Sequence, residues 1–301
     1  MGYNPNYLVS TDDGATFTYG GRLLRWSRPV GDPRYTGLNG GGRPYLKYTQ
    51  AADGTLHVVS TEDHPRNYDN SIYHAMIRDG QIHHSDGRVI APLSRSTETS
   101  VSPQDLTCVF RGDADHVAWV CDVQLDPEGR PRIAFSVQRN GARWRNAPGP
   151  AGDGLDHRYY YARWDGSGWR VNEIAYAGTR LYAGEDDYTG LVALDPQNPK
   201  IVYISTNAHP GSGVPLISTA DSRRHWEIFK GSSPDDGASW TWTPITRDSN
   251  ADNLRPIVPI WPGAGDRTIL LWLRGTYRRY VDYDLDVVGV LPEENPNGAV
   301  R

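Results

Sequence analysis

Two residues of the sequence have the chemistry of an acid–base pair: His64, which follows DGTLHVVSTED, and Tyr188, at the end of EDDY. A histidine titrates near neutrality and can take a proton, and a tyrosine hydroxyl can give one to a leaving oxygen. Arg43, Arg255 and Arg274 could hold a carboxylate through paired hydrogen bonds. An arginine on a uronate carboxylate, a base beside C5 and an acid beside O4 would together perform β-elimination, because neutralising the carboxylate eases removal of the C5 proton. This chemistry does not require a metal.

Four segments with a common layout must position these side chains. Each has a β-rich stretch, a turn with Asp, Gly or Pro, and a second apolar stretch, which predicts two antiparallel strands. The four segments cover residues 43–64, 118–140, 188–209 and 255–276. Further hairpins are predicted between them, over residues 71–87, 157–171 and 226–242, and before them, over residues 6–24.

This repetition predicts the fold. Four-stranded antiparallel units that recur along a chain are typical of a β-propeller. We therefore predict an all-β chain of about five blades that forms a single domain over residues 1–301. Either the N-terminal hairpin completes the last blade and closes a ring, or the chain is part of a larger propeller whose upstream blades precede this sequence. A β-sandwich with the same strand content is the alternative architecture.

Equivalent positions in the four segments predict a ring of side chains. The first strands start and the second strands end on one face of the disc, because the two strands are antiparallel. The residues at these places are Arg43, Trp119, Tyr188 and Arg255 at the strand starts, and His64, Gln138, Asn207 and Arg274 at the strand ends. We expect this polar ring to bind substrate at one mouth of the channel; the alternative is a ring that is solvated and inert.

Two other stretches add candidates for substrate binding. HPRNYDNSIYH contributes Arg66, Asn70 and His74. His74 lies inside a predicted strand, so it is either a substrate contact or a packing residue. His157 opens HRYYYARWDG next to Arg158 and is a further candidate.

A repeated acidic motif is interpreted as structural. STDDGATF begins at Ser10 and SPDDGASW begins at Ser233. Because a catalytic centre is seldom copied whole within one chain, we interpret both copies as tight hairpin turns. The aspartate accepts hydrogen bonds from the turn's amides, the glycine supplies a positive φ, and the aromatic residue returns to the core.

Composition excludes several classes of protein. The 301 residues are 38% hydrophobic and 22% charged, which is a globular composition. The net charge of -5 is not gathered in any one tract, which argues against nucleic acid as a partner. No apolar run is long enough to span a membrane. The 10 Trp and 18 Tyr, against 4 Phe, suit both β-sheets and surfaces that stack on sugars.

Cys108 and Cys121 flank the predicted hairpin CVFRGDADHVAWVC. They could form a cross-strand disulfide or remain as two buried thiols. Without a matching histidine pattern they are not a zinc signature. We therefore expect no metal cofactor from the sequence pattern.

The sequence resembles a known family at several places. The two acidic motifs resemble the Asp-box, or BNR, repeat of sialidases and related propellers. RPYLKY, DGTLHVVSTEDHPRNYDNSIYH, DHRYYYARWDGSGW, RRHWEIFKG and DNLRPIVP resemble the BNR-4 group of secreted propellers, which includes ulvan lyases and rhamnose–glucuronate lyases.

The resemblance implies a seven-bladed fold, a secreted or periplasmic protein that acts on plant or algal polysaccharide, and elimination by His, Tyr and Arg. We also expect a monomer whose partner is an anionic poly- or oligosaccharide. A structural calcium or zinc ion is compatible with the group. Of the lyases' residues, His64 matches their second histidine, whereas Gly41 to Arg43 lack the first, and Trp119 and Gln138 stand where a Tyr and an Arg are expected. The predicted function is a polysaccharide lyase. The alternatives are a rhamnosidase-like or sialidase-like glycoside hydrolase and a non-catalytic glycan-binding propeller.

Overall fold

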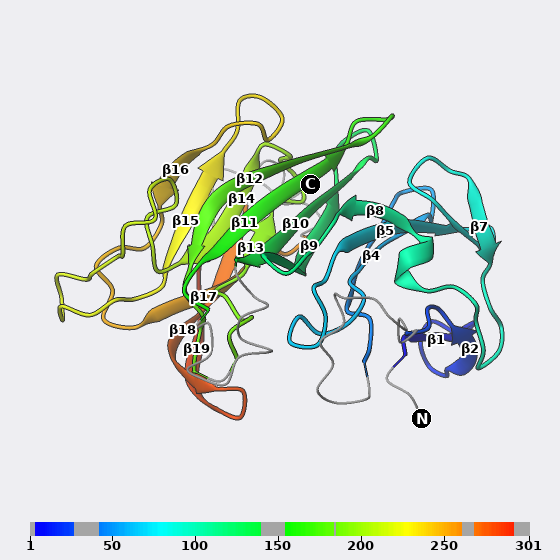
Figure 1. Ribbon diagram of the computed structural model, residues 1–301, viewed down its shortest axis with the longest axis horizontal. Coiled ribbons are helices and arrows are strands. Elements are labelled where there is room, and N and C mark those ends of the chain that lie inside the picture. The colour runs from blue at the N-terminus through cyan, green and yellow to red at the C-terminus, as the bar shows by residue number, and fades with distance from the viewer. Residues whose placement is uncertain (1–3, 27–41, 140–153, 184, 261–267, 292–301) are drawn as a thin grey trace, which may run out of the picture.

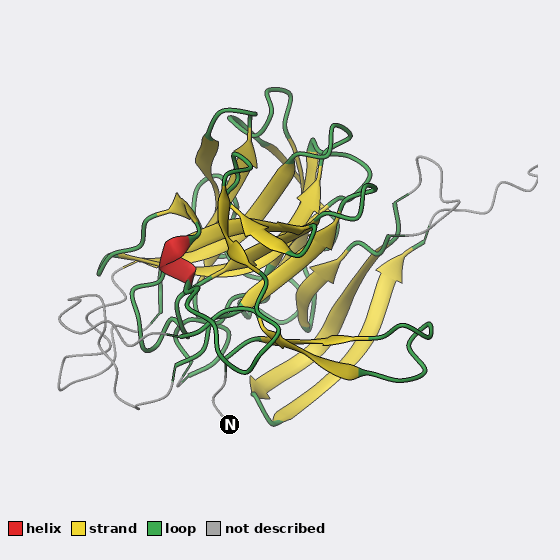
Figure 2. Ribbon diagram, turned by 90° about the vertical axis from the view of Figure 1, so that its right-hand side faces the viewer, coloured by secondary structure: helices red, strands yellow, loops and turns green. Residues whose placement is uncertain are grey.

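Strands account for nearly all the regular structure in the computed structural model, which describes residues 4–26, 42–139, 154–183, 185–260 and 268–291. Within these ranges the one helical element is a short 3-10 turn, η1 (Pro103–Asp105) (Figure 2). The all-β prediction is confirmed. No helix in these ranges has the length and apolar character needed to cross a bilayer.

The strands form successive antiparallel sheets in chain order. A two-stranded sheet contains β1 (Asn6–Val9) and β2 (Thr18–Arg22). The first large sheet contains β3 (Leu46–Gln50), β4 (Leu56–Ser60), β5 (Ile72–Arg78), β6 (Gln81–His83) and β7 (Val89–Pro92), with β8 (Thr107–Phe110) paired to β5. The second contains β9 (His116–Leu125), β10 (Pro131–Arg139), β11 (His157–Trp164) and β12 (Trp169–Gly178). The third contains β13 (Val192–Leu194), β14 (Ile201–Thr206), β15 (Glu227–Ser232) and β16 (Thr241–Pro244). The fourth contains β17 (Asp252–Ile257), β18 (Leu270–Arg279) and β19 (Asp282–Val290).

The large sheets are arranged as blades of a β-propeller. Their first strands, β3, β9, β13 and β17, are neighbours in that order, and the later strands of each sheet lie farther out (Figure 1). Two sheets that pack face to face as a sandwich would not bring the first strand of every meander together. All four predicted strand pairs are present, so the repeat that we inferred from the sequence is confirmed.

Hydrophobic side chains fill the space between successive sheets. Val59 and Ile72 of the first sheet share one core cluster with Phe135 of the second. Tyr159 of the second sheet shares another with Ile204 of the third. A further cluster joins the third and fourth sheets through residues such as Ile228 and Trp272. Because side chains alternate along a strand, each inner sheet can bury both faces against its neighbours.

The N-terminal hairpin does not complete the last blade, contrary to one of the two expectations. The Tyr7 hydroxyl donates to the carbonyl of Ser94 at 2.7 Å, and the Arg22 amide donates to the carbonyl of Ser96 at 2.9 Å. These partners follow β7, so β1 and β2 lie beside the first large sheet and far from β18 and β19 (Figure 1). The hairpin cannot join the last sheet because its backbone contacts are made at the other end of the blade series.

Both acidic motifs form the same hydrogen-bonded turn. In the first, Ser10 Oγ donates to Asp12 Oδ1 at 2.8 Å, and Thr16 Oγ1 donates to Asp12 Oδ2 at 2.6 Å. In the second, the equivalent bonds of Ser233, Asp235 and Ser239 measure 3.0 and 2.6 Å. The structural interpretation therefore agrees with the geometry. The aromatic residues differ: Trp240 packs on Tyr161, whereas Phe17 is 61% exposed and does not return to the core.

Cys108 and Cys121 do not form a disulfide, so the disulfide alternative is wrong. Cys108 lies on β8, which pairs with β5, whereas Cys121 lies on β9, which pairs with β10. The two residues therefore belong to different sheets and do not face each other across a hairpin. Cys121 is buried and Cys108 is exposed, so the expectation of two buried thiols is correct only for Cys121.

Candidate functional site

Three predicted residues from three sheets meet near the inner strands. His64 follows β4, Trp119 lies on β9, and Tyr188 precedes β13. The ring centroid of Trp119 is 4.9 Å from that of His64 and 5.0 Å from that of Tyr188, and the His64 and Tyr188 centroids are 6.4 Å apart. Equivalent positions in the repeat do converge here, as the propeller prediction required.

A cavity of about 210 Å³ opens beside this cluster. Trp119, Tyr188 and Arg255, all expected from the sequence, contribute to its wall. Tyr45, Lys47 and Asp187 also line it, and sequence reasoning missed these three. Lys47 and Tyr45 lie within or just before β3, two residues apart, so the period of 2 along a strand could have assigned them to one face.

Cationic side chains surround the aromatic cluster. The Arg43 guanidinium lies 4.8 Å from the centroid of the Tyr45 ring and donates to its hydroxyl at 2.9 Å. The Arg255 guanidinium lies 5.3 Å from the Tyr277 centroid. Nε of Arg255 is buried and has no hydrogen-bond partner within the described part of the chain. Arg255 also adopts a φ of 54°, which is unusual for a residue other than glycine and is often found at functional sites.

A buried hydrogen-bond network holds the loop that carries His64. The Asp63 amide donates to Asn70 Oδ1 at 3.0 Å, and Asn70 Nδ2 donates to the Asp63 carbonyl at 2.7 Å. The His64 amide donates to Asp63 Oδ1 at 2.6 Å. Asn70 is fully buried, so it positions the His64 loop and the expectation that it contacts substrate is wrong.

His64 is neutral in this environment. Burial first, and the nearby Arg66 and Arg43 charges next, lower its pKa to about 3. The Arg66 amide donates to His64 Nδ1 at 3.1 Å. Since Nδ1 accepts this bond, the proton of the neutral ring is on Nε2. In this arrangement His64 presents an N–H donor to its surroundings.

Tyr188 keeps its proton. Burial, with the negative charge of Glu185 next, raises the pKa of its hydroxyl. Its ring stacks on Tyr182, with centroids 5.8 Å apart, and Tyr182 in turn packs against Tyr277 at 5.6 Å. Tyr188 is therefore a rigidly held hydroxyl donor on the cavity wall.

An ion pair across the site replaces one predicted substrate contact. Nη2 of Arg66 lies 2.5 and 2.6 Å from the two carboxylate oxygens of Glu185. The Arg66 side chain is 34% exposed and that of Glu185 is 17% exposed. Burial raises the pKa of Glu185, and the Arg66 charge opposes that rise. Arg66 therefore neutralises a carboxylate of the protein itself.

Three potential metal ligands come together at the same place. Donor atoms of His64, Glu185 and Asp187 lie within 4.8 Å of one another. Asp187 Oδ2 is 3.8 Å from His64 Nδ1. Arg66 already pairs with Glu185, and its amide bonds His64 Nδ1. A metal ion would have to displace these contacts, so the donor set fits the guanidinium better than an additional cation.

Five other predicted site residues have partners within the protein or are buried in a sheet. His74 is fully buried within the first sheet, where its ring nitrogens lie 3.1 Å from His57 Nδ1 and 2.8 Å from Ser85 Oγ. Asn207 donates to Thr179 Oγ1 at 2.9 Å, and Arg274 donates to Asn250 at 2.7 Å.

Gln138 and His157 are the last two of the five. They face each other across β10 and β11, and both are buried. Burial lowers the pKa of His157 to about 4. Because both side chains are buried within this sheet, neither lines the cavity that holds Tyr188.

Comparisons with known proteins give one family match and several solved structures of low similarity. Residues 10–177 match the model of a family described as BNR repeat-containing family member. No curated protein sequence matches this chain. The crystal structure of polysaccharide lyase Uly1 is similar with a TM-score of 0.49 and 11% identity, over 94% of this chain and 52% of that one. This chain thus spans about half the length of Uly1.

Two further solved structures are similar over most of this chain. An endo-arabinase from Bacteroides thetaiotaomicron VPI-5482 has 11% identity and a TM-score of 0.39, over 92% of this chain and 83% of that one. An α-L-arabinanase of Penicillium chrysogenum, complexed with arabinobiose, has 14% identity and a TM-score of 0.42, over 92% and 71%.

Proposed function

Because the chain belongs to the BNR repeat-containing family, whose model matches more than half of it, we propose that it is a carbohydrate-active β-propeller that cleaves a uronate-containing glycan by β-elimination. The observation that carries this proposal is the cavity in which the protonated Tyr188 lies with Arg255 and Lys47, beside His64. An acid and fixed positive charges in one cavity are what elimination next to a carboxylate needs.

Substrate recognition follows from the aromatic and cationic walls. Trp119, Tyr45 and Tyr188 offer flat faces against which a sugar ring can pack. Arg255 and Lys47 line the same cavity and can neutralise a uronate carboxylate. The buried Nε of Arg255, which has no hydrogen-bond partner among the described residues, supports this role. A hydrogen bond to an anionic ligand would remove the free-energy cost of leaving this buried donor unsatisfied.

The reaction would break the bond between C4 and O4. Tyr188 gives its proton to O4 as that bond breaks, His64 Nε2 takes the C5 proton, and a C4–C5 double bond forms in the product. For this step the ring proton of His64 must first move to Nδ1, which breaks the hydrogen bond from the Arg66 amide and leaves Nδ1 3.8 Å from Asp187 Oδ2. Asp187 would stabilise that tautomer, as a carboxylate does when it orients a histidine base.

The test is a cleavage assay on ulvan, gum arabic, rhamnogalacturonan and glucuronoxylan. Elimination creates an unsaturated product that absorbs in the near ultraviolet, whereas hydrolysis creates new reducing ends without that absorbance. We expect absorbance to rise with at least one polymer, and Tyr188→Phe and His64→Gln to abolish the rise. Tyr283→Phe is the matched control, because Tyr283 is 59% exposed on β19. A flat absorbance trace on all four polymers contradicts the lyase proposal.

A glycoside hydrolase is the second candidate, on one specific observation. Glu185 and Asp187 have carboxylate oxygens within 4.8 Å of each other, and burial raises the pKa of Glu185. Two carboxyl groups this close are the requirement of a retaining glycosidase, and the ion pair with Arg66 would have to open before Glu185 could act as the acid. New reducing ends without near-ultraviolet absorbance, lost in Glu185→Gln, would favour this candidate. Binding without either signal would favour a non-catalytic glycan-binding propeller.

The substrate class also bears on where the protein acts and on its oligomeric state. Uronate-rich polymers of this kind lie outside cells, so we place the activity in a secreted or periplasmic protein. We also propose that it acts as a monomer on its anionic poly- or oligosaccharide, because the cavity is built within one chain.

A further inference from the structure

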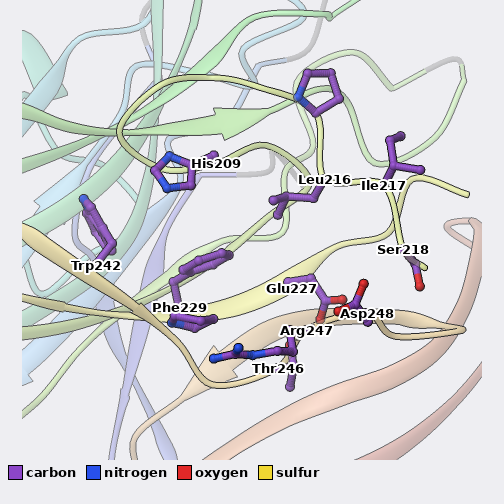
Figure 3. Close-up of a pocket in the computed structure, with 12 residues that line it drawn as sticks. His209, Leu216, Ile217, Ser218, Glu227, Phe229, Trp242, Thr246, Arg247 and Asp248 are labelled. Carbon is purple, nitrogen blue, oxygen red and sulfur yellow. Dashed lines mark hydrogen bonds between the residues drawn. The ribbon is translucent and has the colours of Figure 1, made fainter. Parts of the chain in front are cut away.

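A second groove, of about 410 Å³, lies on the outer part of the third sheet (Figure 3). Its walls come from β15 and β16, from the segment 209–218 and from the turn at 246–248. β16 is the outermost strand of a sheet whose innermost strand, β13, follows Tyr188. The groove is therefore separate from the cavity that holds Tyr188.

An aromatic wall is fixed in orientation. Trp242 lies against Gly231 so closely that a Cβ added to Gly231 would be 2.6 Å from a carbon of the indole ring. The ring also stacks on Trp240, with centroids 6.0 Å apart and planes 24° apart. Phe229 lies beside it in the groove (Figure 3). An immobile aromatic surface binds a flat ligand with little further loss of side-chain entropy.

Two neighbouring residues on the rim, Arg247 and Asp248, offer a donor and an acceptor. Asp248 Oδ1 accepts bonds of 2.9 Å from the amide and from the hydroxyl of Thr219, and these bonds lower the pKa of Asp248, which is therefore ionised. Its other oxygen, Oδ2, has no donor bonded to it among the residues described. The exposed Arg247 guanidinium likewise makes no hydrogen bond or ion pair within the described ranges.

The aromatic wall and the polar rim of the groove together favour one class of ligand. Sugar rings present a flat C–H face beside neighbouring hydroxyls, each of which donates and accepts hydrogen bonds. An aromatic face next to one donor and one acceptor matches that pattern. An apolar peptide would replace the water around Asp248 Oδ2 and the Arg247 guanidinium without offering them a polar partner, at an energetic cost. A nucleic acid would meet the Asp248 carboxylate and gain only one arginine.

We propose that this groove is a second saccharide-binding site, which holds a stretch of the glycan away from the cavity where it is cut. The choice of ligand rests on the proposed function. The groove lets one chain of sugars be held at two places on the molecule, so it raises the affinity for a polymer much more than for a short oligosaccharide.

The test is affinity electrophoresis in gels that contain each of the four polysaccharides named above. It is done in the Tyr188→Phe background, so that the polymer is not cut. We expect retardation by at least one polymer, and a weakening of about tenfold when Trp242→Ala or Arg247→Ala is added. Arg223→Ala is the matched control, because Arg223 is exposed on the adjacent loop and does not line the groove. Thermal unfolding of each variant shows whether it is folded, and Arg247→Ala tests the rim if Trp242→Ala does not fold.

Two results distinguish this site from the proposed function. If a polymer is cut by the wild type but retardation is absent, or is unchanged in both groove variants, the groove proposal is wrong while the cleavage proposal stands. If retardation depends on Trp242 and Arg247 but no polymer is cut, the groove stands and the cleavage proposal is wrong. No cutting and no retardation with any of the four polymers would overturn both.

Discussion

Tyr188→Phe is the most direct test of the proposed chemistry, because the hydroxyl can be removed without disturbing the packing. The substitution keeps the ring, which makes the contacts with Trp119 and Tyr182. Within the described part of the chain no residue bonds the hydroxyl. We therefore expect the free energy of unfolding to change by less than about 0.5 kcal/mol.

The expected loss of activity is much larger. A positioned general acid contributes about 100-fold to 10,000-fold to a rate. The raised pKa of Tyr188 means that the hydroxyl is protonated over the whole neutral range, so the acid carries its proton in all of the enzyme. We expect kcat to fall by that factor, which corresponds to a rise of about 3–5 kcal/mol in the activation barrier, while KM changes little.

The initial rate of the increase in near-ultraviolet absorbance and the urea unfolding curve are to be measured on the same preparation. The pH profile gives a second readout. Because the pKa of Tyr188 is raised, activity should decline only on the alkaline side of the ordinary tyrosine value of 10.0. Because the pKa of His64 is lowered to about 3, activity should show no inflection near 6.5. A Tyr188→Phe variant that keeps more than about a tenth of kcat would refute Tyr188 as the acid.

Three further predictions concern stability. Glu185→Gln removes the partner of Arg66. Because Arg66 is about one-third exposed, we expect the free energy of unfolding in urea to fall by roughly 1–2 kcal/mol. An unchanged midpoint would mean that solvent fully screens the pair. The pKa values of His57 and His64 are lowered to about 4 and about 3, so on acidification the unfolded state binds protons at these residues before the folded state does. Their contribution to the free energy of unfolding is therefore full above pH 6.5 and is lost as the pH drops toward 4. A Tm that is equal at pH 7 and pH 5 would contradict this. Gly231→Ala should lower the Tm because its Cβ would be 2.6 Å from the Trp242 ring, whereas Gly168→Ala, with nothing within 4 Å, should not; equal effects would argue against that packing.

Much of the fold could be predicted because it depends on local pattern. The hairpins at residues 71–87, 157–171 and 226–242 and all four repeated strand pairs are present. Turn chemistry and alternating apolar residues act over a few positions, so they can be read directly from the chain. The two acidic motifs show this most clearly, since both copies form the same bonds within eight residues.

The candidate site was only partly predictable. His64, Trp119, Tyr188, Arg43 and Arg255 gather at the cavity or its rim because equivalent positions of a repeat converge in a propeller. Gln138, Asn207 and Arg274 were assigned by the same rule but do not line the cavity, because equivalent positions of a repeat need not have equivalent burial or partners.

The sequence by itself determined the strands, their turns and the order in which the sheets follow one another, because these depend on residues close together in the chain. Only the tertiary structure decided what each charged side chain pairs with. Arg66 meets Glu185 from 119 residues away, and Lys47 joins Tyr188 on one cavity wall. Cys108 and Cys121 are close in sequence and yet lie in different sheets. Pairings of this kind depend on how blades pack, and burial then sets the protonation of His64 and Tyr188, which no local pattern encodes.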